Sequence, residues 1–532
     1  MATKVRSDFV NMIQNPILPG FHPDPSILRV GDDYYIATST FEWFPGVQIY
    51  HSRDLVNWQL ITYPLTRKSQ LNMIGNINSG GVWAPCLSYD NDLFYLVYTD
   101  VKSRKGAFKD THNYLTVAES IEGPWSEPIF LNSSGFDPSL FHDEDGSKWL
   151  VNMLWDHRKN NNSFAGIVLQ EYSMEQKALV GPTKNIFKGT HLGLTEAPHI
   201  YKKGDYYYLV TAEGGTGYEH AVTIARSKSL SGPYEVDPEN PVLTSKAHNE
   251  LQRAGHASFV ETQNGEWYMA HLCGRPVIDG KCILGRETAI QKCYWTEDGW
   301  LRVEGGNEPK VTVPAPGLEL HPFEVEDNYD NFETTQLKKY WNSLRRPFSE
   351  SWMSLTERPG YLRVKGEESM SSLHNQSLVA RRLEDLSVEI QTTVDYKPVN
   401  FQQMAGLILY YDTDDYVYLR ITHHEEKGKC LNILESKHGE YNELLDEDIP
   451  LSNESICKLK ATINHEQLLF SYSLDGNNWS PIGGKIDISH LSDEDADYIR
   501  FTGAFVGVCA QDLSGGKKHA DFEDFSYRIL ND

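Results

Sequence analysis

The sequence predicts an all-β protein in two parts, a five-bladed β-propeller followed by an antiparallel β-sandwich. Three observations predict this architecture: five strand–turn–strand repeats before about residue 305, a stretch that mixes Pro and Gly after them, and alternating strands beyond it. At 532 residues, the chain exceeds the size at which a single core usually stops growing. We therefore expect two domains.

Each repeat has a short apolar strand, a polar turn rich in Asp, Asn or Gly, and a second strand rich in aromatic residues. The five repeats read PDPSILRVGDDYYIA from Pro23, APCLSYDNDLFYLVY from Ala84, DPSLFHDEDGSKWLV from Asp137, APHIYKKGDYYYLVT from Ala197 and HASFVETQNGEWYMA from His256. Their aromatic strands recur every 54 to 61 residues or so, a little above the usual period of propeller blades but of that kind. Hairpins repeated in this way indicate blades arranged radially around a central channel.

The composition changes at PKVTVPAPGLELHPFEV, which covers residues 309–325. Beyond it, segments such as LSVEIQTTVDY (386–396) alternate with period two, which is typical of strands in an antiparallel sandwich. The sequence therefore predicts a propeller domain over 1–308, a linker over 309–325 and a sandwich domain over 326–532.

The composition excludes several classes of partner. A net charge of −25 argues against binding to nucleic acid or to an anionic membrane surface, and it is compatible with a neutral substrate. Seven scattered cysteines without CxxC spacing indicate reduced thiols rather than a disulfide framework or a zinc site. No window is apolar enough to span a membrane, and the N-terminus has no signal-peptide pattern. We therefore expect a cytoplasmic protein.

Three of the five repeats place a carboxylate at their start. Asp24 and Asp137 occupy one equivalent position, and Glu196 lies one position earlier in its repeat. Equivalent positions in a propeller converge on the axis, so we expect these three side chains to share one site. A proline follows both aspartates, which predicts an extended backbone at each of them. An acid with only a turn-forming role would recur in all five repeats, so its restriction to three favours a functional role.

Paired carboxylates suit the cleavage of glycosidic bonds. A protonated carboxyl group donates a proton to the departing oxygen, while an ionised one activates water or attacks the sugar directly. Three crowded carboxylates repel one another, so at least one of them should have a raised pKa. The repeats alone leave open which acid has which role.

His256 occupies the corresponding position in the fifth repeat. Histidine and carboxylates are suitable metal ligands, but the sequence contains no HExxH motif, no EF-hand loop and no Cys/His cluster. We therefore expect no required cofactor and assign no metal ligands. A loosely bound divalent cation near His256 stays open as an alternative.

Long motifs in both halves of the chain resemble those of a known family. They are FHPDPSILRVGDDYYIATSTFEWFPGVQI, GGVWAP, GFDPSLFHD, LTEAPHIY, GHASFVETQNGEWYMAHL, LGRETAIQK, FQQMAGLILYY and FTGAFVG. Together they resemble glycoside hydrolase family 43, and within it the two-domain bacterial β-xylosidases. The resemblance implies a five-bladed propeller, an inverting mechanism, and a concanavalin-like sandwich that packs on the propeller and closes the active-site pocket.

The resemblance also implies roles for the three acids. Asp24 matches the general base, Glu196 the general acid, and Asp137 the residue that orients the acid and tunes its pKa. An inverting enzyme holds its base and acid about 6.5–9.5 Å apart, which leaves room for the attacking water.

The remaining substrate-binding residues follow from the same motifs. Phe41 and Trp83 match aromatic residues that flank the sugar, and Arg286 matches an arginine that contacts its hydroxyl groups. His256 matches a histidine on the axis beneath the site. Phe505 is our candidate for the sandwich residue that closes the pocket, with Phe501 in the same motif.

The implied activity is exo-acting release of xylose from the non-reducing ends of β-1,4-xylo-oligosaccharides. An α-L-arabinofuranosidase, or an enzyme with both activities, is the alternative on this scaffold, because the two sugars present similar hydroxyl groups. A carbohydrate-binding propeller without catalysis is disfavoured, because it would have no use for three acids. The resemblance further implies a homo-oligomer, and the net charge of −25 leads us to expect no nucleic-acid or membrane partner.

Overall fold

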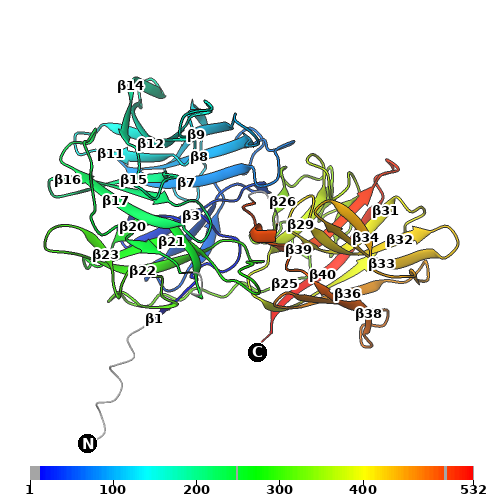
Figure 1. The fold of residues 1–532 in the computed structure, drawn as a ribbon. Coiled ribbons are helices and arrows are strands. Elements are labelled where there is room, and N and C mark those ends of the chain that lie inside the picture. Colours follow the sequence, from blue (N-terminus) through cyan, green and yellow to red (C-terminus); the bar gives the residue numbers. More distant parts are fainter. Residues whose placement is uncertain (1–11, 247–249, 496–499, 531–532) are drawn as a thin grey trace, which may run out of the picture.

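Two β-sheet domains lie side by side in the computed structural model, which describes residues 12–246, 250–495 and 500–530 (Figure 1). Within these ranges, the regular secondary structure consists of β-strands and one 3₁₀ turn, Asp493–Asp495. The described part of the chain has no helix of the length and apolarity that crossing a membrane requires.

The N-terminal domain is a propeller of five antiparallel sheets, and the strands of each sheet follow one another in the chain. Blade one contains β2 (Ser26–Val30), β3 (Asp33–Thr38), β5 (Gln48–Ser52) and β6 (Gln59–Thr62), and blade two contains β7 (Gly81–Asp90), β8 (Leu93–Ser103), β9 (Asp110–Ala118) and β10 (Ile129–Asn132). Blade three contains β11 (Ser139–His142), β12 (Lys148–Trp155), β13 (Phe164–Ser173) and β14 (Ala178–Phe187), and blade four contains β15 (Glu196–Lys203), β16 (Tyr206–Glu213), β17 (Ala221–Ser227), β18 (Glu235–Val236) and β19 (Leu243–Thr244). Blade five contains β20 (Gln252–Glu261), β21 (Trp267–Gly274), β22 (Glu287–Trp295) and β23 (Leu301–Val303).

The aromatic second strand of each repeat holds neighbouring blades together. Consecutive side chains of a strand point to opposite faces of its sheet. Tyr34 of β3 accordingly joins a cluster with Tyr268 of blade five, whereas Tyr35 joins a cluster with Phe94 of blade two. The first of these clusters packs the last blade against the first, so apolar packing closes the ring.

The segment before the first blade is tied to the last blade. Asn15 Nδ2 donates to the carbonyl of Ile290 at 2.8 Å, and Asn15 Oδ1 accepts from the amide of the same residue at 2.9 Å. β1 (Met12–Gln14) pairs with β24 (Thr312–Pro314), which lies in the predicted linker. These contacts fix the entry of the chain into blade one.

The C-terminal domain is a sandwich of two antiparallel sheets around a large apolar core. The first sheet contains β25 (Tyr329–Asp330), β27 (Met353–Ser354), β28 (Leu362–Lys365), β30 (Ser387–Asp395), β36 (Cys457–Asn464), β37 (Gln467–Ser473), β38 (Ser480–Asp487) and β40 (His519–Ile529). The second contains β29 (Ser377–Arg382), β31 (Gln403–Tyr410), β32 (Tyr416–His424), β33 (Gly428–Lys437), β34 (Glu440–Glu443), β35 (Ile449–Pro450) and β39 (Phe505–Asp512). The predicted fold, a five-bladed propeller followed by a sandwich, is confirmed.

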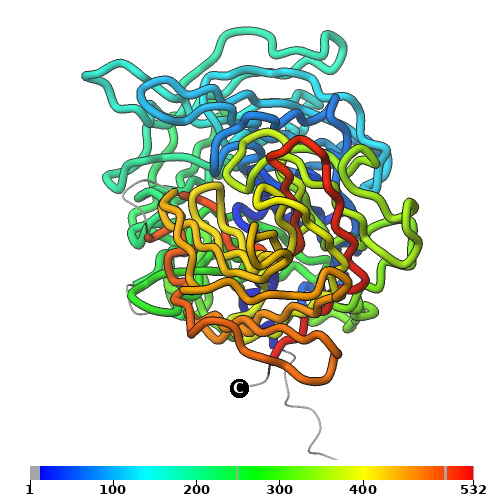
Figure 2. Tube along the Cα trace, turned by 90° about the vertical axis from the view of Figure 1, so that its right-hand side faces the viewer, coloured from blue at the N-terminus to red at the C-terminus, as the bar shows by residue number. Residues whose placement is uncertain are grey.

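The sandwich covers one side of the propeller, as the view in Figure 2 from the sandwich side shows. A two-stranded ribbon crosses the boundary, where β4 (Trp43–Phe44) pairs with β26 (Ser343–Leu344). Next to it, Phe505 stacks on Trp43 with ring centroids 3.6 Å apart and an interplanar angle of 12°. Arg382 Nε donates to the carbonyl of Phe21 at 2.7 Å. The two domains therefore share a continuous apolar and hydrogen-bonded interface.

We predict that Phe505→Ala destabilises the protein, because it removes a fully buried ring from this interface. A buried Phe→Ala change costs about 3–5 kcal/mol, which corresponds to a fall of roughly 5–10 °C in the midpoint of thermal unfolding. Phe401→Ala is the control, since Phe401 is 57% exposed on the sandwich, and it should shift the midpoint by no more than about 1 °C. Equal midpoints for the two variants would contradict the packing described above.

Candidate active site

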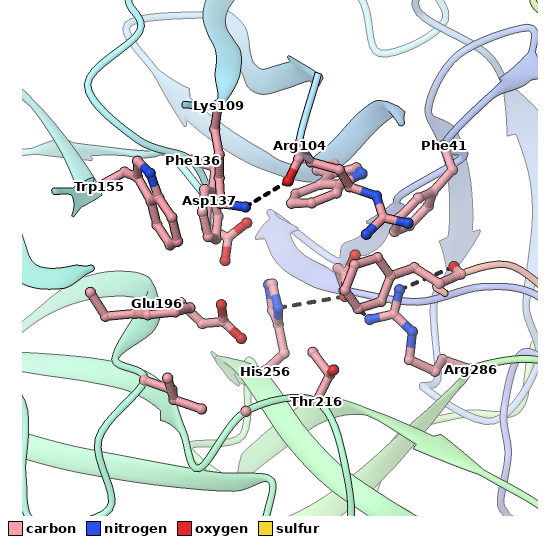
Figure 3. Close-up of a pocket in the computed structure, with 16 residues that line it drawn as sticks. Phe41, Arg104, Lys109, Phe136, Asp137, Trp155, Glu196, Thr216, His256 and Arg286 are labelled. Carbon is pink, nitrogen blue, oxygen red and sulfur yellow. Dashed lines mark hydrogen bonds and ion pairs between the residues drawn. The ribbon is translucent and has the colours of Figure 1, made fainter. Parts of the chain in front are cut away.

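A pocket opens near the propeller axis where the innermost strands of the blades begin (Figure 3). The residue at one equivalent position has a positive φ in every blade. These residues are Asp24 (58°), Ala84 (41°), Asp137 (54°), Ala197 (51°) and His256 (48°). The prediction of an extended backbone at Asp24 and Asp137 is wrong, because the turn common to all five blades overrides the local effect of the following proline.

This turn lets two consecutive residues of a blade face the pocket. The strand register shifts at this point between β7 and β8, between β15 and β16, and between β20 and β21. A shift of this kind re-aims side chains that would otherwise alternate between the two faces of a sheet. Residues at two consecutive positions of the turn consequently line the pocket. The position with positive φ contributes Asp24, Asp137 and His256, and the position before it contributes Trp83, Phe136 and Glu196. The expected convergence of the three acids is confirmed.

Asp24 is the carboxylate with the most favourable partners. Its Oδ1 lies 3.2 Å from Arg286 Nη1 and 3.5 Å from His256 Nδ1, and its Oδ2 accepts a hydrogen bond from Ser39 Oγ at 2.6 Å. Burial by itself would raise the pKa of Asp24, but these three groups hold that pKa below its usual value. Asp24 is therefore ionised at neutral pH.

The pKa values of the other two acids, Glu196 and Asp137, shift in the opposite direction. Burial, and then the charge of Asp24, raises the pKa of Glu196 to about 8. Burial, followed by the charges of Glu196 and Asp24, raises the pKa of Asp137 well above its usual value. At neutral pH the pocket thus holds Asp24 as an ionised carboxylate and Glu196 as a protonated carboxyl group, because burying several negative charges together would be very unfavourable.

Arg286 lies between the two domains and two aromatic rings. Its guanidinium carbon is 5.3 Å from the ring centroid of Phe41 and 5.2 Å from that of Phe501. Its Nη2 donates to the carbonyl oxygen of Phe501 at 3.2 Å. A residue of the sandwich therefore forms part of the pocket wall.

Phe505 does not lie in the pocket, so its predicted position was wrong. It begins β39, and its side chain is fully buried against Trp43. Phe501 precedes that strand and lines the pocket instead, and its amide donates to Ser79 Oγ at 3.0 Å. The structure places Phe41, Trp83, His256 and Arg286 in the pocket wall, where they were expected.

Several pocket residues were missed by the sequence analysis. Phe136 could have been found, because it precedes Asp137 as Trp83 precedes Ala84 in the second blade. Lys109, whose Nζ lies 4.2 Å from the ring centroid of Trp155, had no such signal because it lies outside the repeated positions. The same holds for the other lining residues, Arg104, Trp155, Phe164, Leu194, Gly215 and Thr216.

The surroundings of His256 do not fit a metal site built from protein ligands. Among the residues that the structure describes, no three His, Cys, Asp or Glu side chains converge as ligands. Burial lowers the pKa of His256, and its Nδ1 lies 3.5 Å from Asp24 Oδ1. We derive no chemical step through a metal, and a loosely bound cation stays an untested prediction.

We predict that Glu196→Gln stabilises the protein at pH 8. The carboxyl group ionises near its ordinary value of 4.5 in the unfolded chain but only at about 8 in the fold, so the wild type loses stability as the pH rises from 4.5 to about 8. The amide does not titrate, so the unfolding midpoint of the variant should exceed that of the wild type by roughly 2–5 °C at pH 8, with the difference shrinking towards pH 4.5. Glu261→Gln, at an exposed glutamate, should show no such trend. A gain that grew as the pH fell would contradict the raised pKa.

Comparison with known proteins identifies the family. Residues 13–301 match Glycosyl hydrolases family 43, and residues 329–528 match the Beta xylosidase C-terminal Concanavalin A-like domain. A relative named "Beta-xylosidase" from Bacillus subtilis (strain 168) is 52% identical and covers 97% of this chain and 99% of its own. "Xylosidase/arabinosidase 43B" from Humicola insolens is 51% identical, with 97% of each chain covered.

A solved structure agrees in both domains. The crystal structure of xylan beta-1,4-xylosidase from Bacillus halodurans C-125 is 62% identical, with a TM-score of 0.96 over 97% of this chain and 100% of that one. The chain is therefore a member of glycoside hydrolase family 43 that carries the concanavalin-like C-terminal domain of the family's β-xylosidases.

Proposed function

We propose that the protein is an exo-acting, inverting β-xylosidase, which releases xylose from the non-reducing ends of β-1,4-xylo-oligosaccharides. The observation that carries this proposal is the contrast between ionised Asp24 and protonated Glu196 in one pocket. Hydrolysis with inversion needs a base and an acid that are both in the correct state near neutral pH.

The two carboxyl groups divide the chemistry between them. Glu196 donates its proton to the glycosidic oxygen as the bond to the leaving group breaks. Asp24 accepts a proton from the water that attacks the anomeric carbon from the opposite face. The sugar is released with inverted configuration, and proton exchange with solvent then restores both groups. Asp137 lines the same pocket and is the residue that we expect to orient the acid and tune its pKa; burial, followed by the charges of Glu196 and Asp24, raises the pKa of Asp137 itself.

The rest of the pocket suits a single neutral sugar unit. Its volume of about 250 Å³ is at the small end of ligand sites. Phe41, Trp83 and Phe501 supply apolar surfaces for the faces of a sugar ring, while Arg286 can donate hydrogen bonds to hydroxyl groups. With Phe501 of the sandwich in the wall, the pocket accommodates the end of a chain rather than its middle, which supports exo action.

An α-L-arabinofuranosidase activity in the same pocket is the second candidate. The Humicola insolens relative, which is 51% identical to this chain, is named "Xylosidase/arabinosidase 43B", and this name favours a second activity on arabinosides. A binding module without catalysis has less support, because such a protein would gain nothing from burying three acids. Cytoplasmic location, homo-oligomeric assembly and independence from a cofactor stay predictions from the sequence.

The test is proton NMR of the anomeric signals during the first minutes of xylobiose hydrolysis. We expect α-xylose to be released first from the β-linked substrate, because water attacks opposite the leaving group. Initial release of β-xylose would contradict inversion and would indicate that one carboxylate acts as a nucleophile. An enzyme that cleaves arabinofuranosides but not xylobiose would support the second candidate, and cleavage of neither would refute both.

A further inference from the structure

The boundary between the domains brings an acidic turn of the sandwich against the pocket arginine. Asp493, in the 3₁₀ turn Asp493–Asp495, has a side chain that is only 6% exposed. Its Oδ2 lies 4.0 Å from Arg286 Nε and 3.8 Å from Arg253 Nη1, and Tyr411 donates its hydroxyl proton to Oδ1. A sandwich carboxylate thus faces two arginines of the propeller.

Arg286 is shared between two carboxylates of different domains. Its Nη1 points to Asp24 and its Nη2 to the carbonyl of Phe501. Its Nε makes no hydrogen bond within the described residues, and the nearest acid on that side is Asp493. The orientation of the guanidinium is therefore defined by Asp24 on one side and by the sandwich on the other.

The three acids of the turn differ in their partners, although Asp493 and Glu494 both pair with Arg253. Glu494 pairs with Arg253, while Asp495 pairs with Lys281 and His438. Of these three acids, only Asp493 forms an ion pair with Arg286 among the described residues. The turn therefore contains both a candidate residue for positioning Arg286 and a matched control that joins the domains without reaching the pocket.

We propose that Asp493 is a positioning residue for hydrolysis: it holds Arg286 in place across the domain boundary and reduces the effect of the Arg286 charge on Asp24. This inference rests on the proposed function. A buried guanidinium needs compensating charge, and the negative charge of Asp493 offsets part of the positive potential that Arg286 creates at Asp24. Without the charge of Asp493, Arg286 would act on Asp24 alone, lower its pKa further and make it a weaker base.

The charge of Asp493 itself depends on pH. Among the described residues, the charged and titratable groups that face it include Arg253, Arg286, Glu494, Tyr411, Arg500 and Cys282. Burial, followed by the charge of Glu494, raises the pKa of Asp493 to about 6, against the effect of the two propeller arginines. Asp493 is consequently ionised at neutral pH and becomes neutral as the pH falls through about 6.

The experiment compares Asp493→Asn with Asp495→Asn by steady-state hydrolysis of xylobiose as a function of pH. For Asp493→Asn we expect kcat/KM to fall roughly tenfold, mainly through KM, because Arg286 loses its fixed orientation towards the sugar. We also expect the wild-type kcat/KM to fall as the pH drops through about 6, because Asp493 loses its charge there, and we expect Asp493→Asn to lack this fall. Asp493→Glu, which keeps the charge, should recover most of the loss.

The control separates positioning from loosening of the interface. Asp495→Asn removes the ion pairs that this turn makes with Lys281 and His438, and we expect kcat/KM within about twofold of the wild type and a pH profile that keeps the fall near pH 6. The inference is overturned if Asp493→Asn retains both the wild-type KM and the wild-type pH profile, or if Asp495→Asn reproduces both changes. Failure of the wild type to cleave xylobiose would instead refute the proposed function, and the inference with it.

Discussion

The structure depends above all on one electrostatic constraint: three carboxyl groups are buried in one pocket, and the guanidinium of Arg286 lies against one of them, Asp24. Coulomb repulsion and desolvation prevent all three from being charged. Arg286 and Ser39 favour the charged form at Asp24, and burial together with that charge raises the pKa values of Glu196 and Asp137. The division into base and acid therefore follows from burial and from the position of one arginine.

The backbone that creates this crowding is itself strained. Positive φ at a residue other than glycine costs of order 1–3 kcal/mol, and here it occurs at one equivalent position in every blade. Packing between the blades supports this conformation, and the result is that two consecutive side chains of a blade can enter the pocket. The sandwich completes the site, because Phe501 contributes a ring to the pocket and a carbonyl group to Arg286.

Much of the fold and the centre of the site could be predicted, since both follow from the repeats. The period indicated blades, and equivalence across them brought Asp24, Asp137 and Glu196 together. The local rule for residues before proline failed at Asp24 because the turn is set by the tertiary structure of the propeller. Phe501 and Phe505 could not be separated by sequence, since the direction of each side chain depends on where β39 begins. Lys109 lies outside the repeated positions, where no pattern fixes its location.

The central claim is that Glu196 stays protonated at neutral pH while Asp24 is ionised. The most direct test is ¹³C NMR of enzyme labelled at the side-chain carboxyl carbon of glutamate, titrated from about pH 4 to about pH 9, with Glu196→Gln used to assign the resonance. The structure predicts that the Glu196 resonance titrates with a midpoint of about 8. A midpoint near the ordinary value of 4.5 would contradict the account, because Glu196 would then be ionised and unable to act as the acid.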